Sequence, residues 1–175
     1  MSRKKNAFSL IELVIVIVII GMIAAIAVPR ISRGAKGASA SSLRMDLAVM
    51  RNAIELYAAE HNGDYPSAQG DGTNAKDTEA AFVAQLIKYS KPDGTVADTS
   101  ANGFIYGPYL RRGIPPCPVG TNTGSAAADD VKVVTGATLT PDDSTGWLFS
   151  DTTGDIIANV PDALTDEDGT KYNTY

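Results

Sequence analysis

The sequence predicts an α+β protein in which one long N-terminal helix packs on a small antiparallel β-sheet head. Three observations lead to this fold class. An apolar run covers 8–28, an apolar stripe with helical spacing covers 43–57, and eight of the nine prolines follow residue 63 among short strand-like pieces. A chain of 175 residues has room for one ordinary domain plus such a helical extension.

The apolar run from Phe8 to Val28 comprises 21 residues. As an α-helix it would extend about 30 Å, the thickness of a bilayer hydrocarbon core, so we expect the first half of the long helix to be transmembrane. Three basic residues precede the run, and Arg30, Arg33 and Lys36 follow it. Because each flank carries three basic residues, charge alone does not determine which end of the helix faces the cytoplasm.

Three interpretations compete for this segment. A secretory signal peptide could be cut at the small residues Ala25-Ile26-Ala27, but the run exceeds the usual 7–15 apolar residues of such peptides. An ordinary signal anchor explains the length but not Glu12, whose carboxylate costs about 2.5–3.5 kcal/mol in a lipid-facing helix. The third interpretation is a processed assembly helix in which Glu12 has a partner.

The segment from Lys4 to Leu13 resembles the signal of type IV prepilins and type II secretion pseudopilins. The shared features are a basic leader, Phe8, a glutamate four residues later, a long apolar helix, and a proline at its end, here Pro29. The resemblance implies that a prepilin peptidase cuts between Ala7 and Phe8 and that Phe8 is N-methylated. The family usually has glycine before the cut. Alanine is the smallest change from glycine, so we still expect cleavage.

Glu12 is the predicted assembly residue. The resemblance implies that its carboxylate pairs with the terminal amine of Phe8 on a neighbouring subunit. The sequence by itself shows only that a buried carboxylate there needs a partner. The alternative is that Glu12 lies close enough to the membrane interface to stay hydrated.

The long helix is expected to continue to about His61. Pro29 lacks a backbone N–H and should kink or loosen the helix, and weak helix formers at 32–42 suggest a flexible join. Asn62 or Gly63 is the expected cap, and His61 would suit the C-terminal dipole. The apolar stripe consists of Leu43, Leu47, Met50, Ile54 and Tyr57, and the opposite face carries Arg44, Arg51, Asn52 and Glu55.

The head should contain one short helix and several strands. The helix opens at Asp77-Thr78-Glu79 and ends at 91–94. Strand-like pieces cover 104–106, 109–110 and 131–134. Residues 147–158 predict a β-hairpin with a four-residue turn, in which Trp147 and Phe149 share the face that packs on the long helix. The acidic tail from Asp162 to Tyr175 is expected to be an exposed or partly disordered loop.

The head extends the resemblance loosely. Tyr65-Pro66, the segments 107–110 and 114–116, and the pattern from Trp147 to Asn159 are similar to the head of the major type II secretion pseudopilin. The acidic calcium loop of that family is not found in its usual form. Asp166-Glu167-Asp168-Gly169 does not fit the spacing of ligands in an EF-hand. Calcium binding therefore remains an alternative only in a different coordination geometry.

Enzymatic chemistry has no support in the sequence. The single histidine, His61, and the single cysteine, Cys117, are far apart in sequence and give no persuasive nucleophile–base pair. No Walker loop, G-x-S-x-G or H-E-x-x-H motif occurs. Past residue 60 there are 16 acidic and 7 basic residues, a net charge of −9. Only Arg111-Arg112 suggests a basic patch, so nucleic acid is an unlikely partner.

These observations divide the chain into a leader 1–7, a transmembrane assembly helix 8–29, an amphipathic continuation 30–62 and a head 63–175. The expected function is that of a non-enzymatic subunit of a helical filament, anchored by one pass in a bacterial inner membrane with its head in the periplasm or on an extracellular filament. The type II secretion pseudopilin is favoured.

The alternatives are a type IV pilus subunit for adhesion, motility or DNA uptake, and a signal-peptidase-cleaved periplasmic binding protein. The implied partners are further copies of the chain, prepilin peptidase, an inner-membrane assembly platform with its ATPase, and minor pilins or pseudopilins. No cofactor or metal site is predicted.

Overall fold

The computed structural model describes residues 9–175, without the side chains of 26–33. The predicted leader 1–7, with the cleavage residues Ala7 and Phe8 and the N-methylation of Phe8, therefore lies outside the described residues. The side chain of Pro29 does so as well.

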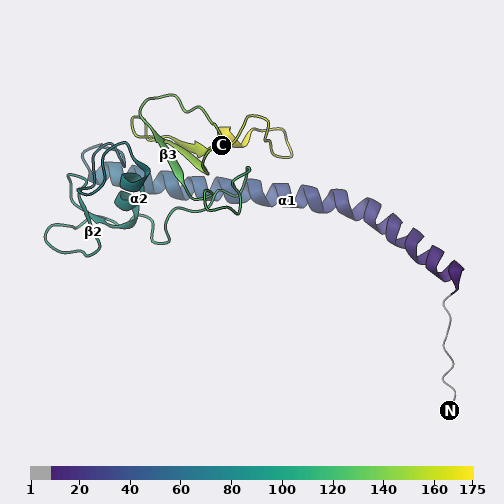
Figure 1. Ribbon diagram of the computed structural model, residues 1–175. Coiled ribbons are helices and arrows are strands. Elements are labelled where there is room, and N and C mark those ends of the chain that lie inside the picture. The colour runs from purple at the N-terminus through teal and green to yellow at the C-terminus, as the bar shows by residue number, and fades with distance from the viewer. Residues whose placement is uncertain (1–8) are drawn as a thin grey trace, which may run out of the picture.

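One helix, α1, runs from Leu10 to Glu60. Its N-terminal half projects away from the head and curves gradually, while its C-terminal half lies against the rest of the chain (Figure 1). The single long helix predicted from the sequence is confirmed. The helix passes residue 29 and the segment 32–42 without interruption, so the expectation of a flexible join there is wrong. Helix formation is cooperative, and a long helix can continue through a few weak formers between two strongly helical halves.

The end of α1 is closed by residues in left-handed conformation. Asn62 has φ 58° and Gly63 has φ 91°. The Gly63 N–H donates to the Ala58 carbonyl at 2.9 Å, which satisfies one of the last helical acceptors. The C-cap residue is His61, and Asn62 and Gly63, which were the predicted caps, follow it in the left-handed conformation.

Helix α2 (Glu79–Ile87) begins after Thr78, whose hydroxyl accepts the Ala81 N–H at 3.2 Å. It ends earlier than predicted, because the chain turns into a small hairpin of β1 (Tyr89–Ser90) and β2 (Val96–Ala97). Pro92 disfavours helical geometry in the residue before it, which explains why the helix does not reach 91.

The second sheet contains three strands in the order β3-β4-β5: Val131–Val134, Trp147–Ser150 and Ile156–Ala158. Strands β4 and β5 form the predicted antiparallel hairpin. Strand β3 pairs parallel to β4, so the sheet is mixed and the prediction of an antiparallel sheet is wrong for β3. The twelve residues between β3 and β4 are long enough for the crossover that a parallel pair requires.

The strand pieces predicted at 104–106 and 109–110 are wrong. Only an isolated bridge joins Tyr106 to Ser90. Beyond Gly107-Pro108, the N–H groups of Tyr109 and Leu110 both donate to the Leu86 carbonyl at 2.9 Å. These groups therefore bond to the end of α2 instead of a neighbouring strand.

The core lies between α1, α2 and the mixed sheet. Trp147 and Phe149 are fully buried in one cluster with Leu47, Met50 and Ile54, which confirms the predicted packing of the hairpin on α1. The Phe149 ring also lies 4.5 Å from that of Phe82 on α2. Leu148 is buried too, so β4 is covered on both faces and not on one.

Most residues of the acidic tail are exposed, as predicted for a loop, but the tail is also held against α1 by contacts that the sequence did not predict. Arg44 donates to the Tyr175 hydroxyl at 2.9 Å and to Asp166 at 3.3 Å, and its guanidinium lies 4.3 Å from the centre of the Tyr175 ring. A short 3₁₀ helix, Tyr172–Thr174, follows, and its residues Tyr172 and Asn173 are buried. We call the set Arg44, Asp166 and Tyr175 the tail clasp. The sequence does not reveal it because Arg44 is more than 120 residues from both Asp166 and Tyr175.

Gly146, just before β4, has no room for a side chain. A Cβ added there would lie 1.9 Å from the Ala128 carbonyl oxygen, a main-chain atom that cannot rotate away. We expect Gly146→Ala to lower the free energy of unfolding of the full chain in detergent by about 1–3 kcal/mol. Gly34→Ala is the matched control, because its added Cβ meets nothing within 4 Å and helix propensity favours alanine. If the two variants had the same free energy of unfolding, Gly146 would have room for a side chain and the prediction would be wrong.

Candidate functional site

Glu12 lies in the first turn of α1 and has a partner within its own chain. Its carboxylate accepts the Ser9 N–H at 3.0 Å. A carboxylate at this position also interacts favourably with the positive end of the helix dipole. The spacing Ser-x-x-Glu at 9–12 is the capping-box signal, which sequence analysis could have used to assign Glu12 this local role. The predicted pairing with a neighbour's Phe8 amine is not tested by this contact.

The N-terminal half of α1 exposes an apolar surface around its circumference. Twelve large apolar side chains between Leu10 and Ile23 are 43–80% exposed. An exposed surface of this kind needs a cover, either of lipid or of other helices. In the part of the chain that the structure describes, no helix combines the length and the hydropathy of a membrane span.

His61 and the hydroxyl of Ser90 lie within hydrogen-bonding distance, and both residues are buried, so no substrate can reach them. His61 is buried, stacks on Tyr57 at 3.7 Å, and uses both ring nitrogens within the fold. Nδ1 donates to the Tyr57 carbonyl at 2.7 Å, and Nε2 lies 3.0 Å from the Ser90 hydroxyl. His61 is the C-cap residue of α1, as the sequence suggested, and its buried ring also joins the end of α1 to β1.

Cys117 is a structural thiol. It is 1% exposed, and its Sγ donates to the Val119 carbonyl at 3.4 Å. Burial raises the pKa of the thiol to about 11, so the reactive thiolate is disfavoured at neutral pH.

The acidic loop at 166–169 folds its first carboxylate onto its own backbone. One Asp166 oxygen accepts the N–H groups of Asp168 and Thr170, each at 2.9 Å, and the other belongs to the tail clasp. The hydrogen bond from the Tyr175 hydroxyl is the main contact that lowers the pKa of Asp166. Among the described residues, no group of three or more histidine, cysteine or acidic side chains is placed to hold a metal ion.

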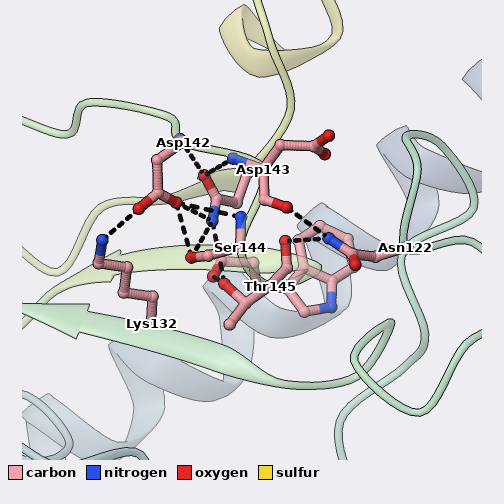
Figure 2. Close-up of polar contacts among 8 residues, drawn as sticks. Asn122, Lys132, Asp142, Asp143, Ser144 and Thr145 are labelled. Atoms are coloured by element: carbon pink, nitrogen blue, oxygen red, sulfur yellow. Dashed lines mark hydrogen bonds and ion pairs between the residues drawn. The ribbon is translucent and has the colours of Figure 1, made fainter.

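A second polar cluster organises the loop before β4 (Figure 2). Asp142 forms an ion pair with Lys132 of β3 and accepts the Asn159 amide at 2.9 Å. The Lys132 ammonium is the main cause of a pKa well below the usual range for Asp142. Asn159 in turn accepts the Asp142 N–H at 2.8 Å and donates to Thr145 at 3.0 Å. Figure 2 shows the hydrogen bonds among these groups, which hold the loop before β4 in place, while Oδ1 of the neighbouring Asp143 is buried without a hydrogen-bond partner.

Asp151 is a buried carboxyl at the β4–β5 turn. Burial and, next, the neighbouring Asp77 carboxyl raise its pKa. The folded state therefore binds more protons than the unfolded state between the ordinary aspartate pKa and the raised one, and stability falls as the pH rises through that window.

We expect Asp151→Asn to raise the melting temperature of the full chain at pH 7, because it removes a buried charge that faces Asp77. At about pH 3, below the ordinary aspartate pKa, the difference should vanish. Thermal melts at the two pH values measure this effect. Asp129→Asn, at an exposed carboxylate, is the control and should change neither melt. A lower melting temperature for Asp151→Asn at pH 7 would contradict the assignment.

Comparison with known proteins gives one match. The family model described as "Prokaryotic N-terminal methylation motif" matches residues 2–28. No curated protein and no solved structure matches the chain. The matched segment includes the predicted leader, Phe8 and Glu12, and does not extend to the head. The chain therefore carries an N-terminal methylation motif of the type IV prepilin kind, which supports a pilin-like protein.

Proposed function

We propose that the chain is a structural, non-enzymatic subunit of a pilus-like filament, with a pilin-like fold. The methylation motif at 2–28 carries this proposal. The apolar N-terminal half of α1 supports it, because such a surface suits lipid before assembly and packed helices after assembly. The head then covers only the C-terminal half of the same helix, which leaves the rest free for neighbours (Figure 1).

We further propose that the filament is a type II secretion pseudopilus, which polymerises to drive protein export. The head segments that resemble the major pseudopilin support this choice over a type IV pilus subunit. The acidic head, with a net charge of −9 past residue 60, also disfavours DNA uptake. The role needs prepilin peptidase, an inner-membrane platform with its assembly ATPase, and minor pseudopilins. It needs no cofactor; calcium, if bound, would show as a calcium-dependent rise in melting temperature.

Processing provides the test of the proposal. Mass spectrometry of the membrane-extracted chain should find a mature form that begins at N-methylated Phe8. The expectation rests on the basic leader, Phe8 and the glutamate four residues later. A chain that begins at Val28 would establish a signal peptide and overturn the proposal. Ala7→Gly is the matched variant and should be cut at least as fast, since it restores the usual family residue.

Deletion in the source bacterium distinguishes the two kinds of filament. Loss of secreted proteins with intact surface pili would support a pseudopilin. Loss of pili with normal secretion would instead identify a type IV pilus subunit.

A further inference from the structure

The sequence contains two Asn-Gly dipeptides, Asn62-Gly63 and Asn102-Gly103, and both are exposed. In such a dipeptide the glycine nitrogen can attack the side-chain carbonyl carbon of asparagine, because glycine has no Cβ to hinder the approach. The bond from that carbon to the side-chain nitrogen then breaks, ammonia leaves, and a succinimide ring remains. Water opens the ring to aspartate or isoaspartate. The two dipeptides are chemically identical, so the surrounding structure decides which of them reacts.

The Gly63 nitrogen is engaged in closing the end of α1. Its N–H donates to the Ala58 carbonyl at 2.9 Å. Attack on the Asn62 side chain would have to break this bond and move the chain away from the helix end. The residue before the pair, His61, is buried and has both ring nitrogens engaged. Asp64 follows the pair, and its negative charge opposes the negative charge that develops on the attacking nitrogen.

The second dipeptide lies at an exposed turn in the loop after β2. The bond that closes this turn runs from the Phe104 N–H to the Ala101 carbonyl at 3.2 Å. In the part of the chain that the structure describes, the Gly103 N–H has no backbone acceptor. Asn102 has φ 56°, a left-handed conformation that residues with a side chain seldom adopt. The attacking nitrogen is therefore free, and opening the turn costs one exposed hydrogen bond.

A lysine lies beside the second dipeptide. A Cβ added at Gly103 would lie 3.5 Å from Cε of Lys91, and the Lys91 ammonium is 4.4 Å from the centre of the Phe104 ring. These distances place the ammonium next to the peptide that joins residues 102 and 103. A positive charge in this place stabilises the negative charge that develops on the glycine nitrogen and on the carbonyl oxygen during the attack.

We propose that Asn102 is a site of spontaneous deamidation promoted by Lys91, and that the fold protects Asn62 from the same reaction. Each conversion consumes one water, releases one ammonia and makes the head more negative by one charge. The isoaspartate product also adds a carbon to the main chain within the turn 101–104. This inference goes beyond the proposed function and holds for either kind of filament.

Peptide mapping by mass spectrometry measures both sites in one sample of the full chain, incubated in detergent at mildly alkaline pH. We expect conversion at Asn102 to exceed that at Asn62 by at least about ten-fold, a difference of about 1.4 kcal/mol in activation free energy. In denaturant the two sites should react at similar rates. Equal conversion in the folded chain, an unreacted Asn102, or a ten-fold difference that persists in denaturant would overturn the inference.

Two variants of Lys91 separate its charge from the simple exposure of the turn. Lys91→Met keeps the apolar stem and removes the ammonium, so it should slow conversion at Asn102 several-fold. Lys91→Arg keeps a positive charge and is the matched control, which should react as the wild type does. Neither variant should alter Asn62. If conversion at Asn102 in Lys91→Met were as fast as in the wild type, or faster, promotion by Lys91 would be wrong.

Discussion

Replacing Trp147 with alanine is expected to abolish the cooperative melting of the head. Trp147 is fully buried on β4, and its indole N–H donates to the Pro115 carbonyl at 2.8 Å. Truncation removes a large buried side chain, which costs about 3–5 kcal/mol, and it also leaves that carbonyl without its partner. Because the free energy of unfolding of such a domain is only about 5–15 kcal/mol, the substitution removes a large part of it.

Circular dichroism melts of the full chain in detergent, followed at a near-ultraviolet wavelength, measure this effect. Phe149→Leu is a graded companion, since it keeps an apolar side chain against Phe82 and should cost less. Ile105→Ala, at an exposed position, should leave the melt unchanged. A wild-type transition for Trp147→Ala would mean that the hairpin does not hold the head together.

Replacing Glu12 with alanine is expected to stop filament assembly while leaving cleavage intact. If the carboxylate pairs with a neighbour's Phe8 amine, its removal strands a buried charge, and the loss of one member of such a pair costs about 3–5 kcal/mol. The peptidase site lies upstream, so processing should continue. Insertion should become easier, because a carboxylate no longer enters the lipid.

Glu12→Gln separates the two roles of this residue. Glutamine can still accept the Ser9 N–H at the start of α1, as glutamate does at 3.0 Å, but it has no charge. If the intermolecular charge pair matters, Glu12→Gln should fail to assemble as Glu12→Ala does. Assembly by glutamine but not by alanine would assign Glu12 to the helix cap. An uncut Glu12→Ala chain would move its role to the peptidase.

The features that sequence predicted well are local. Helical periodicity located α1 from about Phe8 to His61, and the structure places it at Leu10–Glu60. Alternating aromatics and a polar turn located the β4–β5 hairpin, because both depend on neighbouring residues. The basic leader, Phe8 and Glu12 indicated the methylation motif that the family model also matches at 2–28.

The features that sequence missed depend on distant partners. Nothing in Val131–Val134 specifies that it pairs parallel to β4, since the choice depends on the path of the twelve residues between them. The contact of His61 with the Ser90 hydroxyl was not foreseen, because the two residues are 29 positions apart in the sequence.

The tail clasp has a mechanical consequence. Polar contacts fasten the head to α1 at Arg44 and again at His61, with the buried apolar stripe between them. A force applied along the axis of the projecting half of α1 loads these contacts together, in shear, so the head resists as one unit. A force perpendicular to this axis would instead load the contacts at Arg44 before those at His61, so the contacts would break one after another. The molecule should therefore be strong under axial tension and weak under bending, with failure beginning at the tail clasp.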